Sequence, residues 1–429
     1  MIALAWAVAL AVISTVALAR TSRAPRERVA APGRVLLVRT CTGAPPGLAD
    51  ALRTLPSEWP SSARLIFTVA DERDAARPIT RAVAAALRRE GVDAIAVVAR
   101  APGINRKVTQ LVAALASFAA DREVLVVADA DVDLGSLDVA ALWAGLASDA
   151  AACWAPPVEL DARSFADRAS RAVLTASLHA FPLLANLDRD LLVGKAFAIR
   201  LSALAQIGGL APVAAYLGED AALAHRLRVA GHRVRPAAVP VRSLARDRGW
   251  AEVFDRYVRW ALVLRSQRTA LLAAYPLLFA ATPLVLALAF ALGVSAPANA
   301  AACVVAIASR LAVAAGGARR CGRNSGLGSA LVDALLADVL LLAAFARACV
   351  LRRVRWRDRE MRLGADGRLQ PLAEPTQHES RDRVEAAREA ALEHRVVAAP
   401  PNVSGEPRII DAIESTGDGL REHCGTGTR

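Results

Sequence analysis

The chain has 429 residues, 55% of them hydrophobic, and its mean hydropathy of +0.34 is too high for an ordinary soluble enzyme. The formal charge is +12, arginine greatly outnumbers lysine, and the basic clusters lie beside apolar segments. This pattern favours contact with anionic lipid head groups. Aromatic residues make up only 4% and form no base-stacking platform, which argues against nucleic acid as a partner. The six cysteines have no paired spacing, so neither a zinc site nor a disulfide framework is indicated.

The first segment, Met1 to Ala19, is almost wholly apolar and is followed by Arg20, Arg23 and two further arginines. A signal peptide carries its positive charge before the apolar region, whereas here the charge comes after it. We therefore predict that residues 1–20 form an uncleaved transmembrane anchor. The positive-inside rule then places the next domain, residues 21–266, in the cytoplasm.

Apolar strands alternate with helices of roughly a dozen residues in the first part of that domain. This alternation predicts an α/β fold with a parallel, doubly wound sheet covered by helices on both faces. The predicted strands of this part are 35–38, 64–70, 94–99 and 123–131, and the helices between them are 48–55, 78–89 and 105–120. Further on, we expect strands at 151–155, 195–200 and 239–241, and helices at 138–147, 160–190, 202–207, 221–230 and 250–268.

The fourth predicted strand stops at two carboxylates, Asp129 and Asp131. Alternate residues of a strand point the same way, and ligands of open α/β sheets bind outside the carboxyl ends of the strands. Two hard oxygen ligands at such an edge suit Mg2+ or Mn2+. Taken alone, however, an Asp-x-Asp pair is more often a helix cap or a solvated pair.

Two later motifs carry further charged side chains. Glu219 and Asp220 open a predicted helix, where the helix dipole favours carboxylates, although a solvent-facing helix start is the ordinary explanation. Arg256 and Arg259 lie on one helix face, and their planar forks suit a diphosphate. Trp260 is expected either to cover a ring or to pack this helix onto the domain. A membrane-surface helix with basic and aromatic belts is the alternative for this motif.

Residues 267–350 contain three apolar segments, 269–292, 298–315 and 327–350, each long enough to cross a membrane. Three crossings would leave the basic segment 351–372 outside, whereas its arginines place it in the cytoplasm. One segment is therefore expected to be re-entrant or to lie in the interface, and the sequence does not identify which. We predict that residues 373–429 form a disordered tail with one candidate helix, 381–393.

The order of these motifs resembles that of the ceramide glucosyltransferase family of membrane glycosyltransferases, including bacterial relatives that act on hopanoid lipids. The resemblance extends from about Val35 to Leu369. It implies a GT-A-like, Rossmann-type nucleotide-sugar domain with one N-terminal and two to three C-terminal membrane helices. The motifs that carry it are Asp71, Asn105-x-Lys107, Asp129-x-Asp131, Gly208-Gly209, Glu219-Asp220 and Arg256-x-x-Arg259-Trp260.

The resemblance also implies roles for individual residues. Asp220 would be the catalytic base that takes the proton from the acceptor hydroxyl. Asp129 and Asp131 would position the diphosphate, Asp131 through Mg2+ or Mn2+. The remaining substrate-binding positions are Asp71 and Lys107 at the nucleotide, and Arg256, Arg259 and Trp260 at the leaving diphosphate and the acceptor entrance. Arg256 departs from the family pattern, since many members have Gln there.

The expected function is therefore transfer of a sugar, with inversion, from a UDP-sugar to a hydroxyl of a ceramide- or hopanoid-type membrane lipid. The expected location is a bacterial inner membrane, with the catalytic domain in the cytoplasm. One rival is a processive polysaccharide synthase, although the few membrane segments leave little from which to build a polymer channel. The other is a membrane protein that binds a nucleotide sugar without turnover, and such a protein would not need Asp220. The sugar, the lipid and the oligomeric state stay open.

Overall fold

The computed structural model describes residues 1–19, 33–147, 149–188, 191–351, 353–356 and 359–371. Its largest element is a seven-stranded sheet with the strand order β3-β2-β1-β4-β7-β5-β8. These strands are β1 (Val35–Cys41), β2 (Arg64–Val69), β3 (Ala94–Val98), β4 (Val124–Ala128), β5 (Ala150–Trp154), β7 (Ala196–Arg200) and β8 (Arg233–Pro236).

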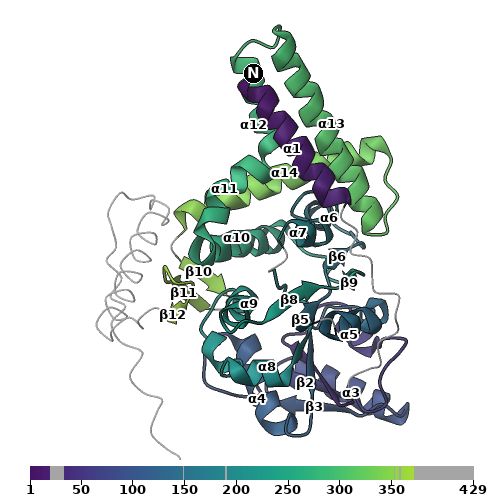
Figure 1. The fold of residues 1–429 in the computed structure, drawn as a ribbon. Coiled ribbons are helices and arrows are strands. Elements are labelled where there is room, and N and C mark those ends of the chain that lie inside the picture. Colours follow the sequence, from purple (N-terminus) through teal and green to yellow (C-terminus); the bar gives the residue numbers. More distant parts are fainter. Residues whose placement is uncertain (20–32, 148, 189–190, 352, 357–358, 372–429) are drawn as a thin grey trace, which may run out of the picture. The chain divides into compact units, whose positions relative to one another are not determined.

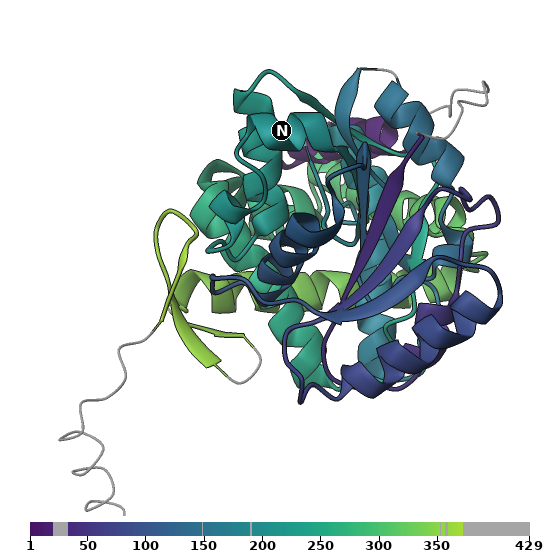
Figure 2. The same ribbon diagram turned by 90° about the horizontal axis from the view of Figure 1, so that it is seen from below.

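Helices cover both faces of this sheet (Figures 1 and 2). One face packs against α2 (Leu48–Arg53), α3 (Ala76–Arg89) and α5 (Val139–Ala147), and the other against α4 (Arg106–Phe118), α8 (Leu201–Gln206) and α9 (Glu219–Val229). Along β4, Val124 and Val126 belong to the first core, whereas Leu125 and Val127 belong to the second. The prediction of an α/β sheet whose strands are buried on both faces is confirmed.

The expectation of a wholly parallel sheet was wrong at one strand. β7 runs antiparallel to both β4 and β5, whereas the other strand pairs of this sheet are parallel. The reversal pairs Ala196 with Ala128. It therefore carries the preceding residue, Lys195, to the carboxyl end of β4, beside Asp129.

Further strands differ from the prediction. The last expected strand, 239–241, begins two residues later as β9 (Val241–Ser243) and pairs with β6 (Pro157–Glu159) in a separate two-stranded sheet. Strand β6 was not expected at all. Strand β8 was not expected either, because its sequence, Arg-Val-Arg-Pro, is short and charged. The predicted helix 160–190 is instead two helices, α6 (Phe165–Ala176) and α7 (Phe181–Leu187).

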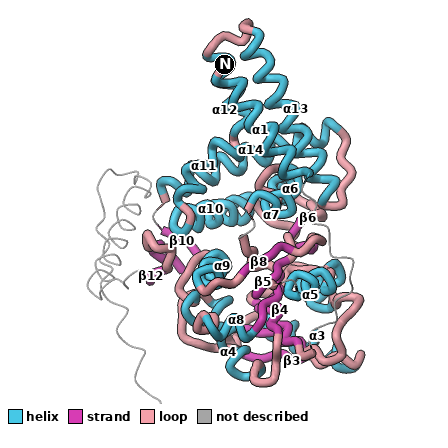
Figure 3. Tube along the Cα trace, viewed as in Figure 1, coloured by secondary structure: helices cyan, strands magenta, loops and turns pink. Residues whose placement is uncertain are grey.

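Beyond the sheet lies a helical region (Figure 3). Within the described residues, α1 (Ile2–Ala19), α13 (Pro297–Arg320) and α14 (Leu327–Val350) are each long and apolar enough to cross a membrane. A fourth span would consist of α11 (Thr269–Phe279) and α12 (Ala281–Ala291), which are bent by 52° relative to one another. Helix α10 (Trp250–Gln267) connects β9 to this region.

A small three-stranded sheet follows α14. It consists of β10 (Arg353–Trp356), β11 (Arg359–Leu363) and β12 (Leu369–Pro371), which were not expected at all. Two short 3-10 helices, η1 (Leu134–Ser136) and η2 (Ala211–Val213), complete the described elements of the first 371 residues. The arginine cluster after Arg20 and the expected tail helix, 381–393, lie outside the described residues.

Candidate functional site

A buried arginine fixes the backbone of the loop that follows β4. Arg39 on β1 is fully buried, and its guanidinium donates to the carbonyl oxygens of Asp129, Ala130 and Val132 at 3.2, 3.0 and 2.6 Å. Burial lowers the pKa of Arg39 to about 10, which still leaves the group charged at neutral pH. Its planar fork can serve several carbonyl oxygens at once, so Arg39 fixes the backbone that presents Asp129 and Asp131.

Two lysines bind the carboxylates of this loop. The ammonium nitrogen of Lys107, in the first turn of α4, lies 2.8 Å from Asp129 Oδ1 and 3.3 Å from Glu219 Oε1. Lys195 forms an ion pair with Asp131 and lies 3.8 Å from Asp129 Oδ2. Burial alone would lower the pKa of Lys107 and raise that of Asp131. Their charged partners outweigh burial, so the pKa of Lys107 is raised and that of Asp131 is lowered.

Asp220 joins the same cluster through the backbone of Gly194. One carboxylate oxygen of Asp220 accepts a hydrogen bond from Gly194 N at 2.8 Å, and the carbonyl oxygen of Gly194 accepts one from Lys107 Nζ at 2.6 Å. A Cβ atom at position 194 would lie only 3.1 Å from Lys107 Nζ and 3.3 Å from Asp220 Oδ2. The Gly194–Lys195 segment therefore ties Asp220 to Asp131, two carboxylates that are far apart in the sequence.

Asn105 fixes the starts of α4 and α9 beside one another. Its side-chain oxygen caps α4 by accepting from Lys107 N at 3.1 Å. Its amide nitrogen donates to Glu219 Oε2 at 3.2 Å. Burial raises the pKa of Glu219, with Lys107 opposing this shift and Asp220 adding to it. Glu219 is thus part of the charged cluster and more than an exposed helix start.

Arg256 reaches the site from α10 and is held by a buried glutamate. Glu159 on β6 forms ion pairs with Arg256 and, at 2.7 Å, with Arg248. Burial alone would raise the pKa of Glu159, but Arg256 and Arg248 lower it to about 2. Arg256 also interacts electrostatically with Asp131. Its Nη2 is buried without a hydrogen-bond partner in the described part of the chain.

Trp260 packs α10 onto the connection between α6 and α7. Its ring stacks on His179 at a centroid distance of 5.7 Å and meets Phe181 edge-on at 5.3 Å. The Arg256 guanidinium lies 4.8 Å from the Trp260 ring centroid. Burial, and then Arg256, lower the pKa of His179 to about 4, so this imidazole is neutral at pH 7. Of the two expected roles of Trp260, packing is the one visible here.

The other two predicted substrate-binding residues are placed differently. Arg259 is half-buried, one helical turn beyond Arg256. Asp71 follows β2 at the same edge of the sheet, but its side chain is 63% exposed and lies 3.8 Å from Arg100. No hydrogen bond or ion pair among the described residues joins Asp71 to the cluster around Asp129.

The two aspartates after β4 are chemically suited to a divalent cation. No group of three or more His, Cys, Asp or Glu side chains in the described ranges is placed to hold a metal ion. Two carboxylates are nevertheless sufficient for Mg2+ or Mn2+ when water and phosphate oxygens complete the shell. Since Lys195 is bound to Asp131, a cation at this carboxylate would have to displace the ammonium group. The donor set fits a cation that arrives together with a diphosphate.

Sequence reasoning missed several residues of the site, namely Arg39, Glu159, His179, Gly194 and Lys195. One signal could have found Lys195. The chain has 53 Lys and Arg residues, and only Lys107 and Lys195 are lysines. A chain that otherwise uses arginine has thus placed both of its lysines on the same pair of aspartates.

The chain also has distant likenesses to solved structures. The mannosyltransferase PcManGT from Pyrobaculum calidifontis, solved with GDP-Man and Mn2+, has a TM-score of 0.41 and 18% identity, covering 81% of this chain and 99% of its own. TarS 1–349 from S. aureus, solved with UDP-GlcNAc, has a TM-score of 0.34 and 11% identity, covering 80% and 100%. Likenesses at this level assign neither donor nor metal here. No curated protein matches the chain.

The family model gives a firmer result. The model described as "Glycosyl transferase family 21" matches residues 1–369, which include the charged cluster, α10 and the apolar helices. This range also agrees with the resemblance that the motifs carry from about Val35 to Leu369. The chain therefore belongs to glycosyl transferase family 21, and the cluster around Asp129, Asp131 and Asp220 lies in the nucleotide-sugar domain of a glycosyltransferase.

Proposed function

We propose that this protein transfers a sugar, with inversion, from a UDP-sugar to a hydroxyl of a ceramide- or hopanoid-type membrane lipid. The observation that carries the proposal is the Gly194–Lys195 segment, which holds the carboxylate of Asp220 in the same site as Asp131. The chemistry needs both groups, because one side of the sugar has a leaving diphosphate and the other an attacking hydroxyl.

Asp220 serves as the catalytic base. A lipid hydroxyl is a poor nucleophile at neutral pH, and a carboxylate within reach can remove its proton as it attacks. Attack on the face opposite the leaving group inverts the anomeric centre, as in inverting glycoside hydrolysis with an alcohol in place of water. The hydrogen bond from Gly194 N orients one oxygen of Asp220, at 2.8 Å.

The positive groups of the site stabilise the departing diphosphate. Lys107 and Arg256 are already charged and held in place by carboxylates, so they need little reorganisation as negative charge develops. Arg259 adds a second fork one turn along α10. Asp71 contacts the nucleotide, and Trp260 borders the entrance of the acceptor. Asp129 and Asp131 would hold Mg2+ or Mn2+, which neutralises charge on the diphosphate.

The apolar helices that follow α10 place the site beside the bilayer that contains the lipid acceptor. A lipid must present its hydroxyl at the interface while its tails stay in hydrocarbon, and α10 leads directly into α11. We assign residues 1–20 and 267–350 to the membrane, 21–266 to the cytoplasmic domain, 351–372 to a basic juxtamembrane segment and 373–429 to a tail. In a bacterium this corresponds to the inner membrane.

The substitution Asp220→Asn tests the role of the base. The amide oxygen can still accept the hydrogen bond from Gly194 N, but it cannot take a proton, so we expect transfer to fall by about 10²- to 10⁴-fold. Binding of the nucleotide sugar, measured by calorimetry on detergent-purified protein, is expected to stay within a few-fold of wild type. Asp149→Asn, at an exposed carboxylate paired with Arg233, is the matched control. Full activity of Asp220→Asn would remove this residue from the mechanism.

A further inference from the structure

We infer that α14 lies along the membrane surface on the side of the catalytic domain, and that α1, α11–α12 and α13 are the segments that cross. This inference concerns the membrane arrangement and does not depend on the donor or acceptor proposed above. It starts from the chain that follows α14. Leu217 N donates to the carbonyl oxygen of Gly367 at 3.1 Å, and Leu369 N donates to that of Ala215 at 2.7 Å.

These contacts fix the side of the membrane on which α14 ends. Residues 215–217 lead directly into α9, which carries Asp220. The strand after α14 is therefore bonded to the catalytic domain itself. The chain enters the helical region from α10, which is also part of the catalytic side through the Arg256–Glu159 ion pair. The number of crossings between these two points must be even, so the α11–α12 pair and α13 can both cross only if α14 does not.

The three helices proposed to cross the membrane pack against one another. α1, α12 and α13 lie side by side (Figure 1), and Ala3 and Ala7 pack with Val285 and Ala302 in one apolar cluster. At the carboxyl-terminal end of α1, Leu18 lies against Gly316, which is near the carboxyl-terminal end of α13. α1 and α13 thus run in the same direction, and α12 runs in the opposite direction, as two inward crossings and one outward crossing require.

Helix α14 packs instead along helices of the catalytic side. Leu336 and Leu340 face Trp250 and Phe254 near the start of α10, and Arg265 near its end donates to the carbonyl oxygen of Ala348. α10 and α14 therefore lie alongside one another over most of the length of α10. Helix α10 carries five charged side chains that exclude it from the hydrocarbon: Glu252, Asp255, Arg256, Arg259 and Arg265. A helix that follows α10 along its length lies at the depth of α10.

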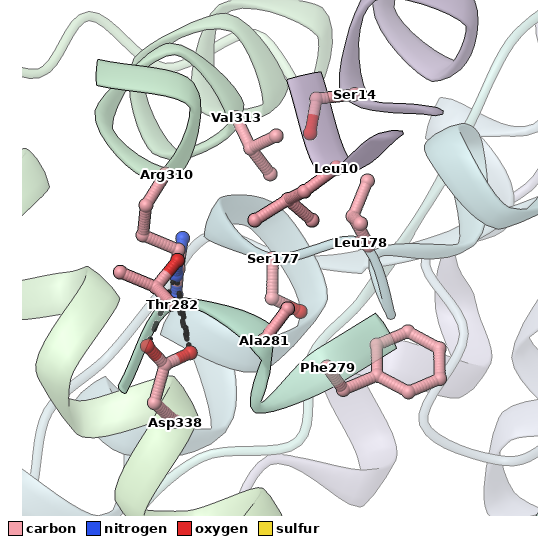
Figure 4. A pocket seen from close by; sticks show the side chains of 10 residues that line it. All are labelled: Leu10, Ser14, Ser177, Leu178, Phe279, Ala281, Thr282, Arg310, Val313 and Asp338. Carbon is pink, nitrogen blue, oxygen red and sulfur yellow. Dashed lines mark hydrogen bonds and ion pairs between the residues drawn. The ribbon is translucent and has the colours of Figure 1, made fainter. Parts of the chain in front are cut away.

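The polar residues of α14 are also held from the catalytic side. Asp333 is 1% exposed and accepts from Arg168 of α6 at 3.2 Å and from Arg323 at 2.8 Å. Asp338 pairs with Arg310 of α13 at 2.9 Å (Figure 4). Arg310 in turn donates to the carbonyl oxygen of Ala176, at the end of α6. Part of the catalytic domain, the end of α6, therefore lies at the same depth as Arg310.

The length of α13 is consistent with Arg310 lying at the depth of α14, near the membrane surface. The part between Pro297 and Arg310 rises about 20 Å at 1.5 Å per residue. An interfacial helix buries its apolar face about 5–10 Å below the head groups. The two lengths together approach the hydrocarbon thickness of roughly 30 Å. α13 can thus cross the bilayer while α14 lies at its surface.

The partner of the outer face of α14 is the lipid leaflet on the catalytic side. Leu331, Leu335 and Val339 form an exposed stripe at a spacing of four residues. Phe165 and Trp250 are exposed beside this helix, with their rings 5.6 Å apart, and aromatic residues of this kind are enriched at membrane interfaces. An apolar groove of about 370 Å³ between α10 and α14 continues the same surface. Val339 belongs to both the stripe and the lining of the groove, and α14 also packs against the crossing helix α13. This continuity favours lipid tails over another protein.

The depth of spin labels tests the inference on the full-length protein. Leu331→Cys and Leu342→Cys are labelled with a nitroxide in a background where Cys303, Cys349 and Cys424 are Ser, and the protein is reconstituted in liposomes. For an in-plane helix we expect the two labels at similar depths by power saturation with oxygen and a nickel chelate. A crossing helix would separate them by about 16 Å. Ala300→Cys and Ala312→Cys on α13 are the matched pair, expected to differ by about 18 Å.

Sidedness gives a second, independent readout. Gln370→Cys after α14, Glu90→Cys in the catalytic domain and Val294→Cys between α12 and α13 are each exposed positions. They are treated with a membrane-impermeant maleimide in right-side-out and inverted vesicles. We expect Gln370→Cys and Glu90→Cys to react in the same vesicles, and Val294→Cys in the opposite ones. Reaction of Gln370→Cys together with Val294→Cys, or a depth difference across α14 equal to that across α13, would overturn the inference.

Discussion

Both lysines of the chain lie in the candidate site, where their ammonium groups offset carboxylates that would otherwise repel one another. Lys107 binds Asp129 and Glu219, and Lys195 binds Asp131. An ammonium group is a compact charge on a flexible stem, so it can move aside when a cation and a diphosphate arrive. A guanidinium held in a fixed fork, such as that of Arg39, is suited instead to holding the backbone of the loop still.

The removal of one aspartate tests this arrangement. Asp131→Ala eliminates a proposed cation ligand and leaves Lys195 with Asp129 alone, so we expect nucleotide-sugar binding to weaken about tenfold or more and to lose its dependence on Mg2+ or Mn2+. Binding titrations of wild type and variant, with and without EDTA, measure this. Asp149→Asn serves again as a distant carboxylate control. Wild-type binding that does not respond to EDTA would contradict a metal-dependent donor site.

The sequence predicted some of these residues and missed others for identifiable reasons. Asp129, Asp131, Lys107 and Asp220 belong to short motifs whose order is specific, so they could be named without a structure. Gly194 and Lys195 act through a backbone bond and a side chain at the start of a strand, and no motif marks them. Their importance depends on the direction of β7, which the sequence does not determine.

At the scale of elements, hydrophobic patterns predicted most strands and helices of the sheet. β4 was predictable because every residue in it is apolar and buried. The reversal of β7 was not, because its run of four apolar residues has the same pattern in either direction. The break between α6 and α7 and the charged strand β8 were also not predicted. The break does not interrupt a clear apolar period, and the sequence of β8 does not continue one.

One buried glutamate joins three of these elements and gives a prediction about pH. Glu159 on β6 accepts from Arg248, from Arg256 on α10 and from Ser170 of α6, the last at 2.7 Å. We expect Glu159→Gln to destabilise the protein by about 3 kcal/mol at pH 7, because it removes the counter-charge that the buried Arg256 and Arg248 share and leaves Arg248 with Asp167 alone. The two arginines lower the pKa of Glu159 from the ordinary glutamate value of 4.5 to about 2 in the folded protein.

The sign of the pH effect follows from this lowered pKa. The stabilisation is complete above about pH 4.5 and is lost as the pH falls towards 2, because the unfolded chain binds a proton at this glutamate over a pH range in which the folded protein still holds it charged. The difference in thermal midpoint between wild type and Glu159→Gln is therefore expected to shrink between pH 6 and pH 3. Intrinsic fluorescence of detergent-purified protein reports both midpoints. An equal difference at the two pH values would show that Glu159 does not act through its charge.

For the whole molecule, hydropathy identified the apolar segments but not their arrangement. The positive-inside rule required an even number of crossings after the catalytic domain. It did not identify which of the three apolar segments does not cross. The contacts of α14 with α6 and α10 supply what composition lacks, since they join segments more than 70 residues apart. The same holds for the strand pairing at Tyr216 and Arg368, which ties the end of the helical region back to the domain.

The central claim is that these parts together move a sugar onto a membrane lipid. The most direct measurement incubates membranes containing the protein with a panel of radiolabelled nucleotide sugars, extracts the lipids and identifies the labelled product. We predict label from a UDP-sugar in an organic-soluble glycolipid whose anomeric configuration is inverted, and none with membranes containing Asp220→Asn. Label found only in free sugar or in an insoluble polymer, with none in the lipid extract, would contradict the account.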